Sequence, residues 1–100
     1  MFAIEKSREG DTVTVRIKGR LDIKNSPELT KELEGLNNDY QTLVIDFSEL
    51  DYLTSAGLRV LLQAEQDAED NDKQMIVRNV SQDIMNIFIQ TSFADVLTIE

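Results

Sequence analysis

The chain has 100 residues, the size of one globular domain, and we expect residues 1–100 to fold as a single domain. Ten Lys and Arg against nineteen Asp and Glu give a formal charge of -9, so nucleic acid and anionic membrane surfaces are poor partners. The absence of Cys and His excludes disulfides, Ser-His-Asp and Cys-His nucleophile systems, and zinc sites built on those side chains. A metal would have to be bound by oxygen ligands alone, and we predict no cofactor.

The apolar stretches of the sequence are short. The longest, such as residues 43–45 and 60–62, fall far short of the roughly 20 residues that a membrane-spanning helix needs. The N-terminal sequence MFAIEKSREG also lacks the basic, apolar and small-residue regions of a secretion signal. We therefore expect no membrane insertion and a cytoplasmic location.

The first part of the chain predicts two strands and a helix. Apolar and polar residues alternate over residues 12–18, which is the period of a strand with one buried face. Residues 2–4 suggest a shorter strand before it, and the break at residues 9–11 favours a hairpin between the two. Ser26 is expected as the N-cap of a helix with Pro27 at its first position, ending near residues 35–38.

The middle of the chain predicts a strand, a loop and a longer helix. Residues 43–47 are almost continuously apolar, which is typical of a central strand covered on both faces. Residues 48–54 are expected to form a loop. From Ser55 to about Asp70 the apolar residues recur at helical spacing, and only Glu65 is out of character on that stripe.

The last part of the chain predicts a buried strand at residues 75–77, a third helix capped by Asn79 or Ser81, and an optional short closing strand at residues 96–99. Strands that alternate with helices imply parallel pairing through right-handed crossovers, while the initial hairpin makes the sheet mixed. The predicted fold class is α/β, a mixed and mostly parallel sheet with the order ββαβαβα and an optional final β.

One edge of this sheet collects the candidate site. Loops after parallel strands meet at the carboxyl ends of those strands, so Asp22 and Ser55 are expected on the same rim. Small residues at 54–57 leave the amides at a helix start accessible, and these favour negative charge, so a phosphate on a hydroxyl here would be tolerated. The alternative is purely structural, with Thr54 or Ser55 as an N-cap and Gly57 as a packing allowance.

Two segments carry a family resemblance. Residues 46–62, DFSELDYLTSAGLRVLL, resemble the signature of the STAS domain, the fold of bacterial anti-sigma factor antagonists, in which a strand ending in Asp-hydrophobic-Ser leads through a loop to Ser-Ser-Ala-Gly-Leu at a helix start. Residues 19–29, GRLDIKNSPEL, are similar to the Gly-Glu-Leu-Asp segment that runs into the first helix of that family. The resemblance spans most of the chain and is in register with the predicted elements.

The resemblance implies a regulator and not an enzyme. Ser55 aligns with the serine that a cognate anti-sigma factor, itself a serine kinase, phosphorylates, and Asp22 aligns with an acid close to that serine. Thr54 stands where the best-studied members carry Asp and adds a second hydroxyl. The unphosphorylated form would bind the anti-sigma factor and so release a sigma factor, and a PP2C-type phosphatase would restore it. The partner-binding residues expected on this basis are Asp22, Asn25, Thr54, Ser55, Gly57 and Arg59.

Two other classes of function stay open. A STAS subunit that binds the ATPase of a lipid transporter fits the same resemblance. A small hydrolase with Ser55 as nucleophile would need a Lys as its base, and no motif places a lysine there.

Several further residues have competing interpretations. Arg59 points outward by its spacing, either toward a partner or into solvent. Asp46, at the end of a buried strand, is expected to accept backbone amides of the loop that follows. The acidic run of residues 65–72 lacks the spacing of a calcium loop and is expected to be a solvated helix end. Met85, Ile89 and Phe93 are expected to pack under the C-terminal segment, or else to mark a second contact surface.

Overall fold

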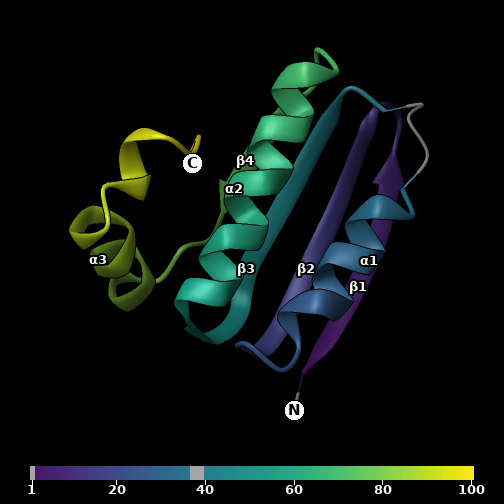
Figure 1. Ribbon diagram of the computed structural model, residues 1–100. Helices are drawn as coiled ribbons and strands as arrows, with labels where there is room; N and C mark the ends of the chain where they lie inside the picture. The colour runs from purple at the N-terminus through teal and green to yellow at the C-terminus, as the bar shows by residue number, and fades with distance from the viewer. Residues whose placement is uncertain (1, 37–39) are drawn as a thin grey trace.

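The computed structural model describes residues 2–36 and 40–100. The elements follow one another as predicted up to the third helix, in the order ββαβαβα (Figure 1). They are β1 (Ala3–Glu9), β2 (Thr12–Leu21), α1 (Ser26–Glu34), β3 (Thr42–Leu53), α2 (Ser55–Asp70), β4 (Gln74–Arg78), α3 (Gln82–Gln90) and the 3₁₀ turn η1 (Phe93–Asp95).

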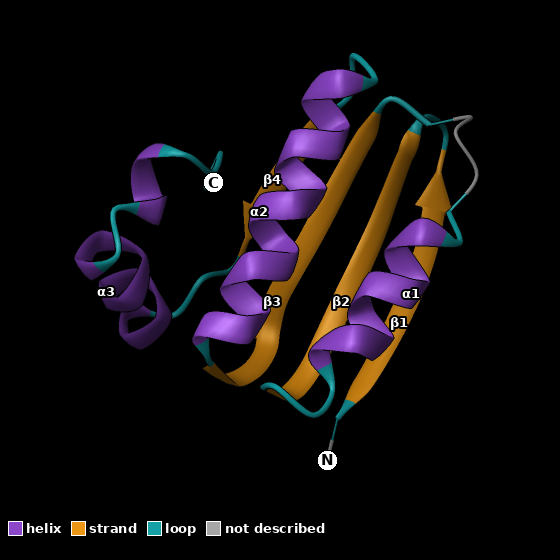
Figure 2. Cartoon of the chain, viewed as in Figure 1, coloured by secondary structure: helices purple, strands orange, loops and turns teal. Residues whose placement is uncertain are grey.

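The strands form one sheet in the order β1-β2-β3-β4. The pair β1 and β2 is antiparallel, while β2 with β3 and β3 with β4 are parallel, which confirms the predicted mixed and mostly parallel sheet. Helices α1 and α2 lie side by side over one face, and α3 lies beyond the edge strand β4 (Figure 2). We call the face under α1 and α2 the inner face and the opposite one the outer face.

Alternation in β2 sorts side chains between the two faces. Val13, Val15 and Ile17 are buried in the core, whereas Arg16 and Lys18 between and beyond them lie on the outer face and are half-buried. The predicted buried run at residues 43–47 of β3 is confirmed, and the core continues into Leu58 and other residues of α2. Burial of these apolar side chains is the dominant force that holds the helices on the sheet.

The prediction of a loop at residues 48–54 is wrong, because β3 continues to Leu53. Two register shifts between β2 and β3 explain why the sequence pattern does not reveal the end of β3. Between Arg16 and Lys18, and again between Gly19 and Arg20, β3 advances by one residue more than β2, as in a β-bulge. Each extra residue interrupts the alternation by which a strand is recognised and bends it, and Figure 1 shows the curved end of β3 leading into α2.

The start of α1 differs from expectation, and the start of α3 agrees with one of its two predicted caps. Asn25, not Ser26, is the N-cap of α1, because the backbone N–H of Ser26 already donates to the carbonyl of Asp22 at 2.8 Å. Gly35 is the C-cap of α1, at the near end of the predicted range, and residues 37–38 lie outside the described residues. Of the two predicted caps for α3, Ser81 is the one used, since its Oγ accepts the N–H of Ile84 at 3.2 Å.

The optional closing strand at residues 96–99 reduces to a single parallel bridge between Val77 and Ile99. The N–H of Val77 donates to the carbonyl of Thr98 at 2.8 Å, and the N–H of Glu100 donates to the carbonyl of Val77 at 2.9 Å. These two bonds hold the C-terminal segment along the outer edge of β4.

Candidate functional site

The ends of β2 and β3 bring the two predicted site segments together. Leu21 and Leu53 are paired in the sheet, and the N–H of Thr54 donates to the carbonyl of Leu21 at 3.0 Å. Asp22 and Ser55 follow these joined residues directly, so they lie at the same end of the molecule. Helices α1 and α2 both begin at this end, and the sequence pattern predicts the site here.

The two neighbouring hydroxyls of this end have different surroundings. Thr54 is half-buried at the N-cap position, makes no side-chain capping bond, and donates its Oγ1 hydroxyl to the carbonyl of Leu21 at 3.4 Å. Ser55 is the first residue of α2 and is exposed. An exposed hydroxyl can meet another protein without any change of fold, so Ser55 is the better placed of the two.

Gly57 is buried, and its packing explains why it is a glycine. A Cβ at this position would lie 2.7 Å from Cδ1 of Leu53 and 2.8 Å from Cγ of Leu21. Only a residue without a side chain lets the first turn of α2 approach the strand ends this closely. The packing interpretation therefore accounts for Gly57, whereas the partner contact expected of it remains a prediction.

The loop between β2 and α1 is held by its own polar groups. Asn25 Oδ1 accepts the N–H of Asp22 at 2.7 Å, and Asp22 Oδ1 accepts the N–H groups of Lys24 at 3.0 Å and Asn25 at 3.2 Å. Asn25 Nδ2 also donates to the carbonyl of Arg20. Such Asx contacts fix a short loop, so Asp22 and Asn25 set the shape of the rim beside Ser55.

Three exposed residues at this end, Arg20, Ile23 and Tyr52, were not predicted as site residues. Ile23 is 79% exposed and Tyr52 is 45% exposed, and the guanidinium of Arg20 lies 4.7 Å from the centre of the Tyr52 ring. Arg59 is exposed, as its helical spacing predicts. Large apolar side chains in solvent beside cations are typical of a protein contact surface.

Comparison with known proteins decides the family. A family model described as "Mlab, STAS domain" matches residues 4–98. The chain belongs to the STAS domain family. Among curated proteins, the anti-sigma-B factor antagonist of Listeria monocytogenes is 24% identical over 96 residues, which cover 95% of this chain and 84% of that protein.

Solved structures share the fold of this STAS domain. An anti-sigma factor antagonist from Mycobacterium paratuberculosis superposes with a TM-score of 0.82 at 18% identity, covering 99% of this chain and 85% of that one. The anti-sigma factor antagonist SpoIIAA in its unphosphorylated form gives a TM-score of 0.78 at 18% identity, covering 100% and 88%. The phosphorylated form of this Bacillus protein gives 0.75 at 19% identity, covering 100% and 91%.

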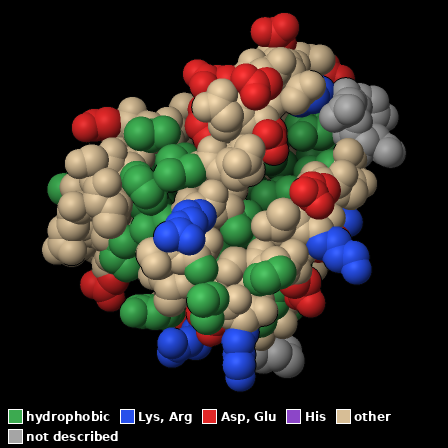
Figure 3. Space-filling model, viewed as in Figure 1, with side chains coloured by type: hydrophobic (Ala, Val, Ile, Leu, Met, Phe, Trp, Pro, Cys, Tyr) green, Lys and Arg blue, Asp and Glu red, His purple; other side chains and the backbone are tan. Residues whose placement is uncertain are grey.

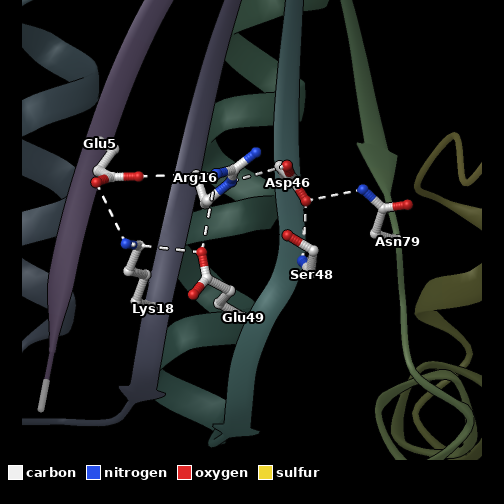
Figure 4. Close-up of polar contacts among 7 residues, drawn as sticks. All are labelled: Glu5, Arg16, Lys18, Asp46, Ser48, Glu49 and Asn79. Carbon is white, nitrogen blue, oxygen red and sulfur yellow. Dashed lines mark hydrogen bonds and ion pairs between the residues drawn. The ribbon is translucent and has the colours of Figure 1, made fainter.

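Away from the Ser55 end, the STAS domain has a buried carboxylate on the outer face of the sheet. Asp46 accepts the N–H of Ser48 at 2.9 Å, Nδ2 of Asn79 at 2.9 Å and Nε of Arg16 at 3.1 Å (Figure 4). Burial alone would raise the pKa of Asp46, but these hydrogen bonds outweigh it and lower the pKa to about 2. The predicted structural role of Asp46 is confirmed, and its bond to Asn79 joins β3 to the segment after β4.

Arg16 extends this arrangement into a network of ion pairs across three strands. Its Nη1 lies 3.8 Å from carboxylate oxygens of Glu5 on β1 and of Glu49 on β3. Lys18 Nζ bridges the same two acids at 3.2 Å and 3.6 Å (Figure 4). We call these five charged residues, together with Ser48 and Asn79, the outer-face network.

The acidic run after Glu65 forms the far end of α2, as predicted. Gln63 Nε2 donates to Asp67 Oδ1 at 3.0 Å and Gln66 Nε2 to Asp70 Oδ1 at 3.1 Å, both in exposed positions. Within residues 2–36 and 40–100, no three His, Cys, Asp or Glu side chains are grouped so that they could hold a metal ion. In the same described ranges, no helix is both long and apolar enough to cross a membrane.

The apolar side chains near the C-terminus are divided. Met85 and Phe93 are half-buried and pack against the core. Ile89 is 59% exposed and so departs from the prediction that all three residues are covered. A single exposed isoleucine on α3 does not by itself form a contact surface.

Proposed function

We propose that this STAS domain is an anti-sigma factor antagonist. Unphosphorylated, it binds an anti-sigma factor that is also a serine kinase and so releases a sigma factor, and phosphorylation of Ser55 by that kinase switches it off. The observation that carries the proposal is the exposed Ser55 hydroxyl at the start of α2, beside the end of β2 that carries Asp22. The names of the curated relatives and the two forms of SpoIIAA support it.

The proposed switch acts through charge. A phosphate adds about -1.5 to -2 charge units, and burying it at an interface requires that it lose its water. Ser55 is exposed and the packing of the first turn of α2 rests on Gly57, so the fold does not depend on the Ser55 side chain. Phosphorylation therefore removes binding and leaves the domain folded, and a PP2C-type phosphatase restores the binding form.

The residues around Ser55 take the supporting roles. Asp22 and Asn25 fix the loop that forms one side of the contact, Thr54 joins that loop to the start of α2, and Arg59 meets the partner one turn further on. Gly57 sets how closely these segments approach one another.

The test is phosphorylation by a purified anti-sigma factor kinase with ATP, followed by mass mapping. We expect one phosphate on the peptide that contains Ser55. Ser55→Ala should abolish the label and keep binding to the kinase, and the matched variant Thr54→Val should keep the label. A Ser55→Ala variant that is labelled as fully as the natural chain would show that Ser55 is not the acceptor.

A second candidate is a STAS subunit that binds the ATPase of a lipid transporter. This second function stays a candidate because the family model that matches the chain is described as "Mlab, STAS domain". That description does not name an anti-sigma factor antagonist. Specific copurification with a transporter ATPase, without labelling by anti-sigma factor kinases, would favour this function over the first.

A further inference from the structure

The cations of the chain fall into two groups. Among the described residues, Lys6, Arg16, Lys18 and Arg78 form ion pairs with acids, and Arg8 and Lys73 also have interaction partners. The remaining four of the ten Lys and Arg form no ion pair within residues 2–36 and 40–100. These four are Arg20, Lys24, Lys31 and Arg59.

Arg20, Lys24 and Arg59 lie around the Ser55 end, whereas Lys31 lies in the last turn of α1. Lys31 and Arg59 line a shallow hollow of about 460 Å³ between α1 and α2, together with Ile23. Arg20 and Lys24 belong to the loop that carries Ile23. Figure 3 shows Lys, Arg and apolar side chains over the part of the molecule where α1 and α2 begin, whereas Asp and Glu gather over the far end of α2. We call the following set the Ser55 surface: Arg20, Ile23, Lys24, Lys31, Ser55 and Arg59.

The charge of this end differs from that of the rest. The acids of the same segments that are not in an ion pair are Asp22, Glu28, Glu34 and Asp51. With Glu32, which pairs with Lys6, residues 20–34 and 51–59 hold four cations and five acids, so this end has a formal charge of -1 and the rest of the chain carries -8. An acidic protein is repelled by the rest of the molecule much more than by this end, where it also finds cations with no ion pair to break.

We propose that the Ser55 surface docks an acidic protein surface that holds an apolar pocket for Ile23. This inference rests on the proposed function and adds the chemistry of the partner. Arg side chains bind carboxylates through two parallel hydrogen bonds, and a protruding apolar side chain gives such a contact a desolvated centre. Complementary charges then orient the encounter. A nucleic acid or an anionic bilayer would extend past this small end and meet the acidic remainder.

The charge balance also explains why a phosphate at Ser55 is an effective switch. Because the end carries a formal charge of only -1, about -1.5 to -2 added charge units make it clearly acidic, like the rest of the molecule. The phosphorylated molecule then repels an acidic partner on all of its sides. Phosphorylation thus cancels the charge difference that selects this end, in addition to placing a bulky group in the contact.

The first test needs no kinase. The full unphosphorylated chain, labelled with ¹⁵N, is titrated with a short synthetic peptide of alternating Glu and Leu, and in parallel with a Lys and Leu peptide and a Glu and Ser peptide. We expect the Glu and Leu peptide to shift the amides of Ile23, Lys24 and Arg59, the Glu and Ser peptide to shift them less, and the Lys and Leu peptide not at all. No shift at these amides, or equal shifts with the Lys and Leu peptide, would overturn the inference.

The second test measures binding to the purified anti-sigma factor kinase with ADP. Lys24→Gln and Arg59→Gln should each weaken binding about 3- to 10-fold, mainly through slower association. The matched control is Asn86→Asp on α3, which changes the net charge equally and keeps an acceptor for Gln82. Ile23→Ser should weaken binding about tenfold or more, against Ile89→Ser as the control for an exposed isoleucine.

The two proposals fail in different ways. If the kinase labels Ser55 but the Gln variants bind as tightly as Asn86→Asp, the proposed function stands and the acidic-partner inference is wrong. If the Glu and Leu peptide binds at the Ser55 surface but no kinase labels Ser55, the docking chemistry stands and the phosphorylation switch is wrong. Binding of phosphatidylglycerol vesicles through Lys24 and Arg59 would overturn the assignment to a protein partner.

Discussion

The outer-face network and the Ser55 surface both contain charged side chains, but they use them differently. On the outer face, Arg16 and Lys18 are shared among Glu5, Asp46 and Glu49, and the central carboxylate is buried and fully hydrogen-bonded. At the Ser55 surface the cations form no ion pairs within the described ranges, and an isoleucine is left in solvent. Charges that are paired within the chain serve its stability, while cations that form no ion pair and lie beside an exposed apolar side chain are available for recognition.

The largest expected effect is on the outer face. Asp46→Ala removes the acceptor for Ser48, Asn79 and Arg16 and should lower the free energy of unfolding by about 2–4 kcal/mol. Urea unfolding measures this change. Glu49→Gln on the same face is the control, with an expected loss below about 1 kcal/mol because its ion pairs are exposed. Equal losses in both variants would show that burial does not distinguish the two carboxylates.

Lowering the pH should also remove the contribution of the Asp46 carboxylate to the free energy of unfolding. The pKa of Asp46 in the folded chain is about 2, below its ordinary value of 3.8, so its contribution is fully present above pH 4 and is lost as the pH falls through 2. Between these limits the natural chain should lose about 2 kcal/mol that Asp46→Asn does not lose. Urea titrations at several pH values measure the difference, and parallel declines for the two chains would contradict the assignment.

A smaller loss of stability is expected where the packing of the sheet reaches the Ser55 surface. Gly57→Ala places a Cβ against Leu53 and Leu21 and should destabilise the chain by about 1–2 kcal/mol. The matched variant Gly35→Ala, at the end of α1, meets no atom closer than 3.4 Å and should be neutral or slightly stabilising. Thermal unfolding compares the two variants. If Gly57→Ala is as stable as Gly35→Ala, the close approach of α2 to the strand ends is not required.

The smallest effect on stability is expected at the Ser55 surface itself. Ser55→Glu and Arg59→Gln should each change the free energy of unfolding by less than about 0.5 kcal/mol, because both side chains are exposed. The same variants should weaken partner binding, and this separation of stability from binding is the sharpest form of the comparison. A Ser55→Glu variant that unfolds several degrees below the natural chain would show that the Ser55 side chain contributes to stability as well as to binding.

Local patterns in the sequence predicted most of the fold. The alternation in β2, the continuous apolar run in β3 and the helical stripe of α2 each report one element and the face that it buries. The end of β3 was missed because its two bulges depend on pairing with β2, a partner that the local sequence does not show. The N-cap of α1 was displaced by one residue for a similar reason, since the Asn25 and Asp22 contacts decide where the helix begins.

The candidate site was predictable in part. The motif at residues 52–58 and the order of the strands were enough to place Ser55 and Asp22 at one end of the molecule. Ile23 and Tyr52 were missed because both lie in segments without a hydrophobic period, where only the packed chain shows which apolar side chains stay exposed. Of the network around Asp46, only a bond to backbone amides that follow Asp46 was anticipated, because Arg16 and Asn79 come from distant parts of the chain.

The bridge between Val77 and Ile99 has a consequence for how the molecule avoids self-association. An edge strand with open hydrogen-bonding groups is a template for pairing with another chain. On β4 the C-terminal segment occupies that position through Thr98 and Glu100, whereas β1, at the opposite edge, carries the charged residues Glu5, Lys6, Arg8 and Glu9. Removing residues 98–100 would expose the hydrogen-bonding groups at the edge of β4 and favour aggregation through strand addition. The charged side chains of β1 would still oppose such pairing at the other edge.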